Sequence, residues 1–518
     1  MHKRPNILFS NSAQNIIVAL FLCLIFVMYC VWSFSPVLAQ FGGDNATYLL
    51  TAKLFSPYIP SSLVSEYFAA QSQYPPLYPL LLSLVGGAES ILLAHILTTF
   101  FLIFSILVMY RWAFSLGLGK LHALALVVIF AMTPGTYMQA LSILSENLYL
   151  LLSLSVLCVI TLKDNNEKWD WLAVFLVVCA SLTRSAGLPL VLSFIIYIFI
   201  IKKRNKYLLS LTALLPMIVW GLFNNQSSTS YATLFSEYYS ADFVAVIFQQ
   251  MLDQSIYMLS VWHRTFTNGS SGYLLLSIFA ILCSFGVVYS LYMKRIDGIY
   301  VLLYILMILA WPYPAESMRL LYPVVPVLLV QVSILMKDFS PNWNSIYGAN
   351  IGNIILEGIL LIILVPNLAL TISRFIVPVE EYLAPYKRTY DWYDPNPNSA
   401  INGIKFTHGI ISSLKDAKNY VPEEQCVYSI KPSVIGLYME RISHKPPTIS
   451  VDDKNFYKIV EQSNCKYFYM LPFASPTYST SFYPYERMKD YIDIIKVYYL
   501  DNDNKGQIVA ILAKLNNI

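Results

Sequence analysis

The amino-acid sequence predicts a polytopic α-helical membrane protein that ends in a smaller α/β domain outside the cytoplasm. Composition is the first observation: 57% of the 518 residues are hydrophobic and 12% are charged, and the mean hydropathy is +0.56. Soluble domains carry about a quarter charged residues. The second observation is a change along the chain, because residues 1–376 form long apolar runs and residues 377–518 are polar and tyrosine-rich. The third is that basic residues gather at the ends of apolar runs, where they mark topology rather than a nucleic-acid site.

A membrane-spanning helix needs about twenty apolar residues, and fewer where protein shields it. On this basis we expect about eleven transmembrane helices, of which the third, fifth and ninth are short. The first run is longer than the apolar part of a signal peptide, so we expect it to be retained. The expected spans are residues 15–38, 91–110, 121–134, 143–162, 170–183, 187–201, 207–223, 272–293, 299–312, 320–336 and 351–375.

The distribution of lysine and arginine predicts the orientation. With a cytoplasmic N-terminus, the cytoplasmic links hold thirteen basic residues: Lys3, Arg4, Arg111, Lys120, Lys163, Lys168, Lys202, Lys203, Arg204, Lys206, Lys294, Arg295 and Lys337. The opposite links hold four: Lys53, Arg184, Arg264 and Arg319. Cytoplasmic loops retain basic residues. We therefore predict a multi-pass protein of the inner (plasma) membrane with a cytoplasmic N-terminus and a periplasmic C-terminal domain.

Two long loops and the tail are expected on the outer face. Residues 39–90 contain Tyr74-Pro75-Pro76 followed by an apolar stretch too short to span. Proline is tolerated in the first helical turn, so we expect short helices in the outer interface. Residues 224–271 are typical of a loop with amphipathic turns.

The tail, residues 377–518, has an α/β pattern. PEEQCVYSIKPSVIGLYMERISHKPP predicts strand, turn, helix and strand, followed by a helix near residues 453–463 and a strand at CKYFYML. Cys426 and Cys465 can form a disulfide if this domain lies outside the cytoplasm. The cysteine and histidine spacing does not indicate a zinc site.

Ionisable residues at the predicted outer membrane face are the candidates for function. Charged groups at membrane depth are costly and usually face a protein-lined cavity. Asp44 follows two glycines after the first span, and Glu146 and Arg184 lie at the ends of later ones. The remaining candidates are Glu316, Arg319, His263 and Arg264. Arginine can grip phosphate with two hydrogen bonds, and a carboxylate can take a proton from a hydroxyl nucleophile.

Structural roles remain open for several of these residues. Glu146 follows Ser145 at a helix start, where an acid stabilises the helix dipole. Glu316 and Arg319 are spaced to pair with each other on one helix face. Arg264 can equally be a solvated loop cation.

Five segments resemble the GT-C superfamily of polyprenyl-phosphate-dependent glycosyltransferases. They are GGDNATYLLTAK, QYPPLYPLLLSLVGG, LSENLYLLLSLSVL, SLTRSAGLPL and ESMRLLYPVVPVLL. The resemblance is to bacterial members related to protein O-mannosyltransferases and to the aminoarabinose transferase acting on lipid A. It implies a GT-C-like membrane domain over residues 1–376 and an extracytoplasmic domain that shapes the substrate cavity.

The resemblance also implies roles for individual residues. Asp44 matches the general base of the first outer loop, and Arg184 and Arg319, with Arg264 as a weaker match, would hold the donor phosphate. Lys53, Tyr74, Glu146, His263 and Glu316 would line the cavity. Some relatives carry two acids in the first loop, whereas Asn45 follows Asp44 here. No tightly bound metal is therefore expected, and any second carboxylate would come from Glu66, Glu146 or Glu316.

The implied function is inverting transfer of a monosaccharide from a polyprenyl-phosphate carrier, such as undecaprenyl phosphate, to a hydroxyl of a glycolipid, polysaccharide or protein. One alternative is an oligosaccharide polymerase or ligase with a diphosphate-linked donor. The presence of His263 and Arg264 in an outer loop favours this alternative. A second alternative is a lipid-linked sugar transporter or flippase. A transporter predicts charges at the bilayer midplane and on inner loops as well.

Overall fold

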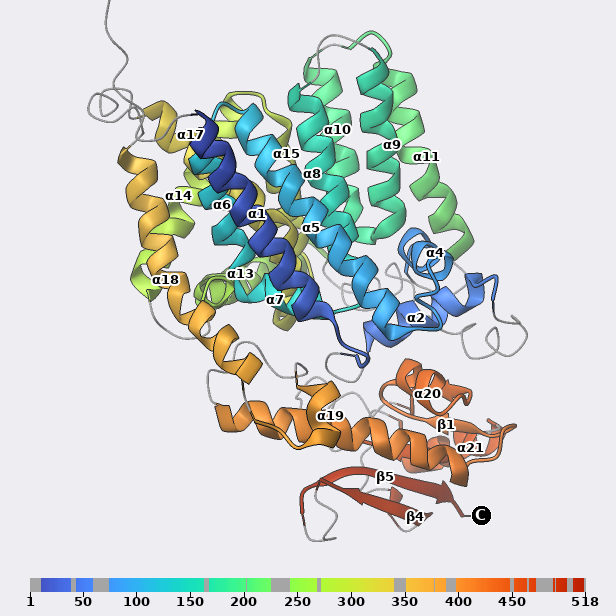
Figure 1. The fold of residues 1–518 in the computed structure, drawn as a ribbon. Coiled ribbons are helices and arrows are strands. Elements are labelled where there is room, and N and C mark those ends of the chain that lie inside the picture. Colours follow the sequence, from blue (N-terminus) through green and yellow to red (C-terminus); the bar gives the residue numbers. More distant parts are fainter. Residues whose placement is uncertain are drawn as a thin grey trace, which may run out of the picture.

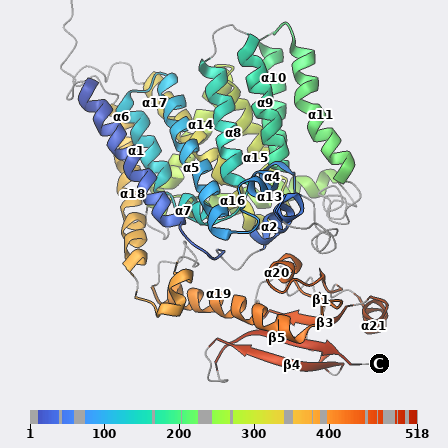
Figure 2. The ribbon, with the colours of Figure 1, turned by 45° about the vertical axis from the view of Figure 1, so that its right-hand side comes forward.

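The computed structural model describes residues 11–38, 43–58, 74–162, 167–201, 203–224, 243–267, 272–339, 351–376, 378–387, 397–447, 451–463, 465–471, 488–489, 491–500 and 506–516. Roughly parallel and antiparallel helices form a bundle, and a smaller domain with a β-sheet lies beyond one end of it (Figure 1). The view turned by 45° shows the same separation (Figure 2).

Each of the apolar segments expected to span the membrane overlaps a helix. These helices are α1 (Asn11–Ser33), α5 (Ile91–Ser115), α6 (Lys120–Ala131), α8 (Glu146–Leu162), α9 (Glu167–Thr183), α10 (Leu188–Ile200), α11 (Lys206–Asn224), α14 (Tyr273–Tyr292), α15 (Ile296–Leu309), α17 (Val325–Phe339) and α18 (Ile351–Ile376). Their buried side chains form one continuous core, in which Tyr29, Trp32 and Trp112 are the largest residues near α1 and α5.

Fewer helices are long enough to cross a membrane than the sequence predicted. Among the described residues, five are long and apolar enough, or six if the bent pair of α6 and α7 (Pro134–Leu141) is one span. Glu146–Leu162, Ser185–Ile200, Lys206–Leu222 and Ile296–Leu309 are apolar but shorter. The helices identify a multi-pass membrane protein, but the count of about eleven is not confirmed, because it included segments below the usual spanning length.

Short helices gather at the end of the bundle that faces the C-terminal domain (Figures 1 and 2). As expected, the first long loop contains two, α2 (Asp44–Phe55) and α4 (Leu77–Leu84). The second was predicted as a loop with turns, and this was wrong for α13 (Phe243–Val261), which has 19 residues. Gln250 and Gln254 are polar residues that interrupt the apolar pattern of α13. Their side-chain amides donate to the Trp311 carbonyl at 2.9 Å and to Ser317 Oγ at 2.5 Å, so these two residues hold α13 against the segment 311–317.

The C-terminal domain contains a five-stranded mixed sheet in the order β2-β1-β3-β5-β4. The strands are β1 (Cys426–Tyr428), β2 (Ser443–His444), β3 (Cys465–Met470), β4 (Ile492–Tyr499) and β5 (Ile508–Leu515), and the helices are α19 (Pro397–Ala417), α20 (Pro432–Tyr438) and α21 (Asp453–Gln462). β1 is parallel to β2 and β3, while β5 is antiparallel to β3 and β4. The α/β order predicted for residues 422–471 is confirmed. Cys426 and Cys465 face each other across β1 and β3 and form the disulfide that the sequence left open.

Candidate active site

The N-terminus of α2 places Asp44 at the end of the bundle nearest the C-terminal domain. Gly43 precedes it with φ of 73°, a left-handed conformation that glycine adopts without strain. Asn45 anchors the N-terminus of α2, because its Oδ1 accepts a 2.6 Å hydrogen bond from the Ile143 amide. One turn later, Tyr48 OH and Ser145 Oγ are 2.7 Å apart. Two contacts thus hold α2 against the residues that lead into α8.

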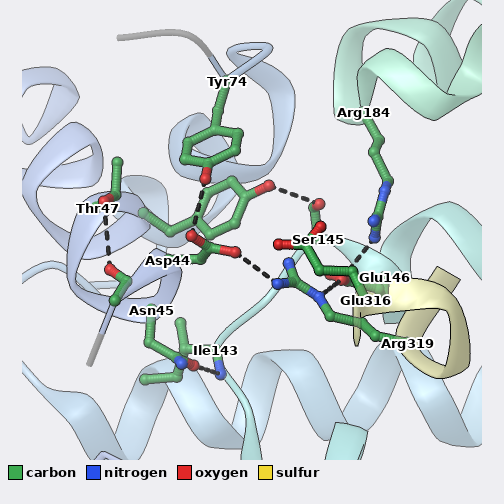
Figure 3. Close-up of polar contacts among 12 residues, drawn as sticks. Asp44, Asn45, Thr47, Tyr74, Ile143, Ser145, Glu146, Arg184, Glu316 and Arg319 are labelled. Atoms are coloured by element: carbon green, nitrogen blue, oxygen red, sulfur yellow. Dashed lines mark hydrogen bonds and ion pairs between the residues drawn. The ribbon is translucent and has the colours of Figure 1, made fainter. Parts of the chain in front are cut away.

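Arg319 links two carboxylates that are far apart in the sequence. Its Nη1 lies 2.5 Å from Asp44 Oδ2, and its Nε donates to Glu146 Oε1. Tyr74 OH donates to the other Asp44 oxygen at 2.9 Å (Figure 3). Arg319 is carried by the short helix α16 (Ser317–Leu321), directly after the segment that Gln250 and Gln254 anchor. The guanidinium therefore holds Asp44 and Glu146 in one cluster.

Glu146 is completely buried at the first residue of α8. Arg184 approaches from the opposite side and forms an ion pair with it, with Nη1 2.6 Å from Oε1 (Figure 3). Two guanidiniums thus compensate one buried charge, which would otherwise be strongly destabilising. Glu146 Oε2 has no hydrogen-bond partner within the described ranges. The helix-start position was consistent with a simple cap, but the side chain bridges two arginines instead.

A tight turn positions Arg184. The residue precedes the 3₁₀ turn Ser185–Gly187, which joins α9 to α10. A Cβ atom on Gly187 would lie 2.8 Å from Ser181 Cα and 2.9 Å from the Ala180 carbonyl oxygen. Only glycine allows the turn to pack this closely against the end of α9. The position of Arg184 therefore depends on a backbone contact.

The side chain of Glu316 lies beside the cluster, and it receives a 3.2 Å hydrogen bond from Trp311 Nε1. The pairing with Arg319, which the sequence left open as a structural alternative, is not made in the described part of the chain. Arg319 binds Asp44 and Glu146 instead. A spacing of three residues therefore permits an ion pair but does not require one.

Three other candidates lie outside this cluster. Lys53 is in the last turn of α2, where its charge acts on Glu440 of the C-terminal domain. His263 and Arg264 belong to the 3₁₀ turn Trp262–Thr265, where the His263 ring packs edge-on against Tyr273 with centroids 5.2 Å apart and Arg264 is exposed. Within the described residues, no hydrogen bond or ion pair joins these three to the cluster. Glu66 lies outside the described residues.

Exposure separates the two clustered acids. The Asp44 side chain is 34% exposed and that of Arg319 is 25% exposed, whereas Glu146 is inaccessible. Burial acts to raise the pKa of Asp44, but the charge of Arg319 and the hydrogen bonds from Arg319 and Tyr74 outweigh it, so the pKa is lowered. Asp44 is therefore ionised at neutral pH and reachable from outside, as a proton acceptor must be.

The C-terminal domain also contacts this region, which sequence reasoning did not predict. Ser433 Oγ in α20 donates to the Gly43 carbonyl at 3.2 Å. Lys431, just before α20, lies close to the same glycine. Contacts between residues about 390 positions apart leave no local pattern in a single sequence.

One group of described residues has donor atoms close enough to hold a metal ion. Cys426, His444 and Cys465 have ligand atoms within 4.8 Å of one another. While the two cysteines form a disulfide, neither offers the thiolate that binds zinc. This group lies on the sheet, away from Asp44 and Glu146, which are bound to arginines.

Neither a protein-family model nor a curated protein matches the chain. Solved structures do. ArnT from Cupriavidus metallidurans in the apo state matches with a TM-score of 0.54 and 11% identity over 97% of this chain and 98% of that one. The same protein bound to undecaprenyl phosphate gives a TM-score of 0.50 and 12% identity over the same shares.

A second protein is similar over almost as much of the chain. The Archaeoglobus fulgidus oligosaccharyltransferase, tethered to an acceptor peptide, matches with a TM-score of 0.51 and 11% identity over 95% of this chain and 74% of that one. At this identity the likeness concerns the fold. The chain has the fold of the GT-C glycosyltransferases, and the resemblance seen in its sequence is confirmed at that level.

Proposed function

We propose that this protein is a membrane glycosyltransferase that moves a monosaccharide from a polyprenyl-phosphate carrier to a hydroxyl group of an acceptor at the outer membrane face. The observation that carries the proposal is the accessible, ionised Asp44 held by Arg319 beside the buried Glu146–Arg184 pair. The fold agrees with it, since a protein of the same fold binds undecaprenyl phosphate. The acceptor is a glycolipid, a polysaccharide or a protein.

In this proposal Asp44 is the general base. Its carboxylate takes the proton of the acceptor hydroxyl as that oxygen attacks the anomeric carbon of the sugar. The bond from that carbon to the phosphate oxygen breaks, and the carrier leaves as a phosphate monoester. Attack on the face opposite the leaving group inverts the anomeric configuration. Asp44 is chosen over Glu146 because a substrate can reach only the exposed carboxylate.

Arg319 and Arg184 would stabilise the leaving phosphate. Guanidinium groups form paired, charge-assisted hydrogen bonds with phosphate oxygens. Arg319 is the more exposed of the two and bonds Asp44 directly, so it can move from the carboxylate to the incoming phosphate. That exchange would release Asp44 for the acceptor. Glu146 would keep both arginines in place, and Tyr74 would orient Asp44.

Asp44→Asn tests the proposed base. The amide cannot accept the proton, so we expect turnover of a polyprenyl-phosphate-linked sugar to fall about 10²- to 10⁴-fold. The assay uses purified full-length protein and detects the released carrier phosphate, with thermal unfolding as the check on folding. Asp493→Asn is the matched control, since this exposed acid lies in β4 of the C-terminal domain and makes the same change from carboxylate to amide. Full activity of Asp44→Asn would refute the assignment.

A second candidate is a ligase or polymerase with a diphosphate-linked oligosaccharide donor. The observation that favours it is the packing of the turn Trp262–Thr265, which carries His263 and Arg264, against α16, which carries Arg319. Offering both kinds of donor to the purified protein decides between the two. Turnover of the diphosphate-linked donor alone would replace the monosaccharide proposal.

A further inference from the structure

Helix α20 of the C-terminal domain lies directly against α2 of the bundle (Figures 1 and 2). The contact includes Gly43, immediately before the proposed base. Its carbonyl accepts the hydrogen bond from Ser433, and a Cβ atom on Gly43 would be 3.7 Å from Lys431 Nζ. The side chain of Lys431 therefore ends beside the first turn of α2.

Local structure brings Lys431 to this position. It is the N-cap residue of α20, and Pro432 follows at the first helical position. Its amide hydrogen-bonds Ser429 Oγ at 3.3 Å, which fixes the chain before the helix. A cation is disfavoured at a helix N-terminus, where the dipole is positive. The helix dipole therefore does not favour a lysine at this position.

The charges of the cluster are not balanced for an anionic substrate. Asp44, Glu146 and Glu316 contribute three carboxylates, and Arg184 and Arg319 contribute two guanidiniums, each paired with at least one of those acids. A phosphate that enters this site adds further negative charge. Holding it among these partly buried groups requires more positive charge than the two arginines supply.

Lys431 is placed to supply that charge. Burial raises the pKa of Asp44, whereas the charge of Arg319 and the hydrogen bonds from Arg319 and Tyr74 lower it. The charge of Lys431 lowers this pKa further, so the Lys431 ammonium lies within electrostatic reach of the Asp44 carboxylate. A second lysine is near. Desolvation, and then the charge of Lys431, lower the pKa of Lys445. Two neighbouring cations repel each other, and an anion between or beside them relieves that repulsion.

We propose that Lys431 binds the phosphate of the lipid-linked donor, so that the C-terminal domain supplies part of the donor site from the side of Gly43 and Asp44. Arg184 and Arg319 approach the phosphate from the bundle, and Lys431 approaches it from the opposite domain. This inference rests on the proposed function, since it assumes a donor with a lipid monophosphate. No covalent step involves Lys431.

Lipid binding by the full-length protein tests the proposal. Purified protein in detergent is titrated with undecaprenyl phosphate and, separately, with undecaprenol, which has the same chain and no charge. We expect Lys431→Ala to weaken phosphate-lipid binding about tenfold, the size of one lost charge-assisted hydrogen bond, and to leave undecaprenol binding unchanged. Lys431→Arg should restore most of the preference. Lys514→Ala, an exposed lysine of β5, is the control and should bind as the wild type.

The possible results are distinguishable. A lost preference for the phosphate lipid in Lys431→Ala, recovered in Lys431→Arg, supports the proposal. Equal loss of both lipids, or wild-type binding of both, overturns the role of Lys431 and leaves the proposed function standing. If the wild-type protein does not prefer undecaprenyl phosphate over undecaprenol, both this inference and the monophosphate-donor proposal are refuted.

Discussion

The two ends of α15 lead to polar clusters of different construction. At its first turn, Arg295 Nε and Nη2 bind the two oxygens of Asp297 at 2.9 and 3.0 Å, and Gln331 Nε2 adds a 2.9 Å bond. That cluster is built mostly from residues two apart, with one cation for one acid. Beyond the other end, Arg319 binds acids 173 and 275 residues away, and Glu146 keeps an oxygen without a hydrogen-bond partner in the described chain.

The difference separates a structural cluster from one that can exchange partners. In the local Arg295–Asp297 pair both carboxylate oxygens have partners, and the pair fixes a helix start, although Gln331 Oε1 beside it has no hydrogen-bond partner in the described chain. The Arg319 cluster is assembled from four distant segments, is partly exposed, and has hydrogen-bonding capacity left over. Such a cluster can bind a substrate without unfolding a helix end.

Replacing each arginine by lysine should distinguish the clusters most strongly. Arg319→Lys keeps the charge but cannot bridge Asp44 and Glu146 with a planar guanidinium. We expect kcat/KM for the lipid-linked sugar to fall at least about 100-fold. Arg295→Lys should change kcat/KM by less than about twofold. Similar losses in both variants would show that the two clusters serve the same purpose.

A smaller effect is expected from the turn before α10. Gly187→Ala places a methyl group 2.8 Å from Ser181 Cα, so the turn must shift and move Arg184 away from Glu146. We expect about a tenfold loss of kcat/KM, since small misplacements of positioning groups are costly. Gly221→Ala in α11 is the matched control, because nothing lies within 4 Å of its added methyl group. It should keep full activity and gain about 0.5–1 kcal/mol of stability. Unchanged activity in Gly187→Ala would contradict the role given to this turn.

The smallest effect concerns pH. The lowered pKa of Asp44 means that its carboxylate stays ionised above the ordinary value of 3.8, and that base activity is lost only as pH falls below it. The pH profile of kcat/KM should therefore be flat on its acidic side down to that region. Arg319→Gln removes the largest favourable charge, so the acidic limb should move to higher pH in the residual activity of that variant. An acidic limb at the same pH in both proteins would contradict the coupling.

The sequence was sufficient where membrane physics restricts the choices. Charged residues at the ends of apolar segments were predicted to meet at one depth, and the structure brings Asp44, Glu146, Arg184 and Arg319 together. The positions of helices also followed from apolar runs. In each case the cost of charge or of unpaired backbone in lipid leaves few arrangements.

The failures of prediction occur where long-range partners override local pattern. The loop predicted at residues 224–271 contains α13, whose glutamines have partners more than sixty positions away. The Glu316–Arg319 pair, which the spacing left open, is not made among the described residues, because Arg319 reaches two distant acids. Lys431 was missed because only the packing of α20 on α2 brings it near Asp44.

The hydrogen bond between Ser433 and Gly43 has a consequence for biosynthesis. The two residues are 390 positions apart, so Asp44 and its loop leave the ribosome long before α20 has been synthesised. During that interval the first long loop lacks the surface against which it finally packs. The loop gains this support only after α20 has been synthesised, so a product truncated before α20 would carry Asp44 without the contact from Ser433 to Gly43.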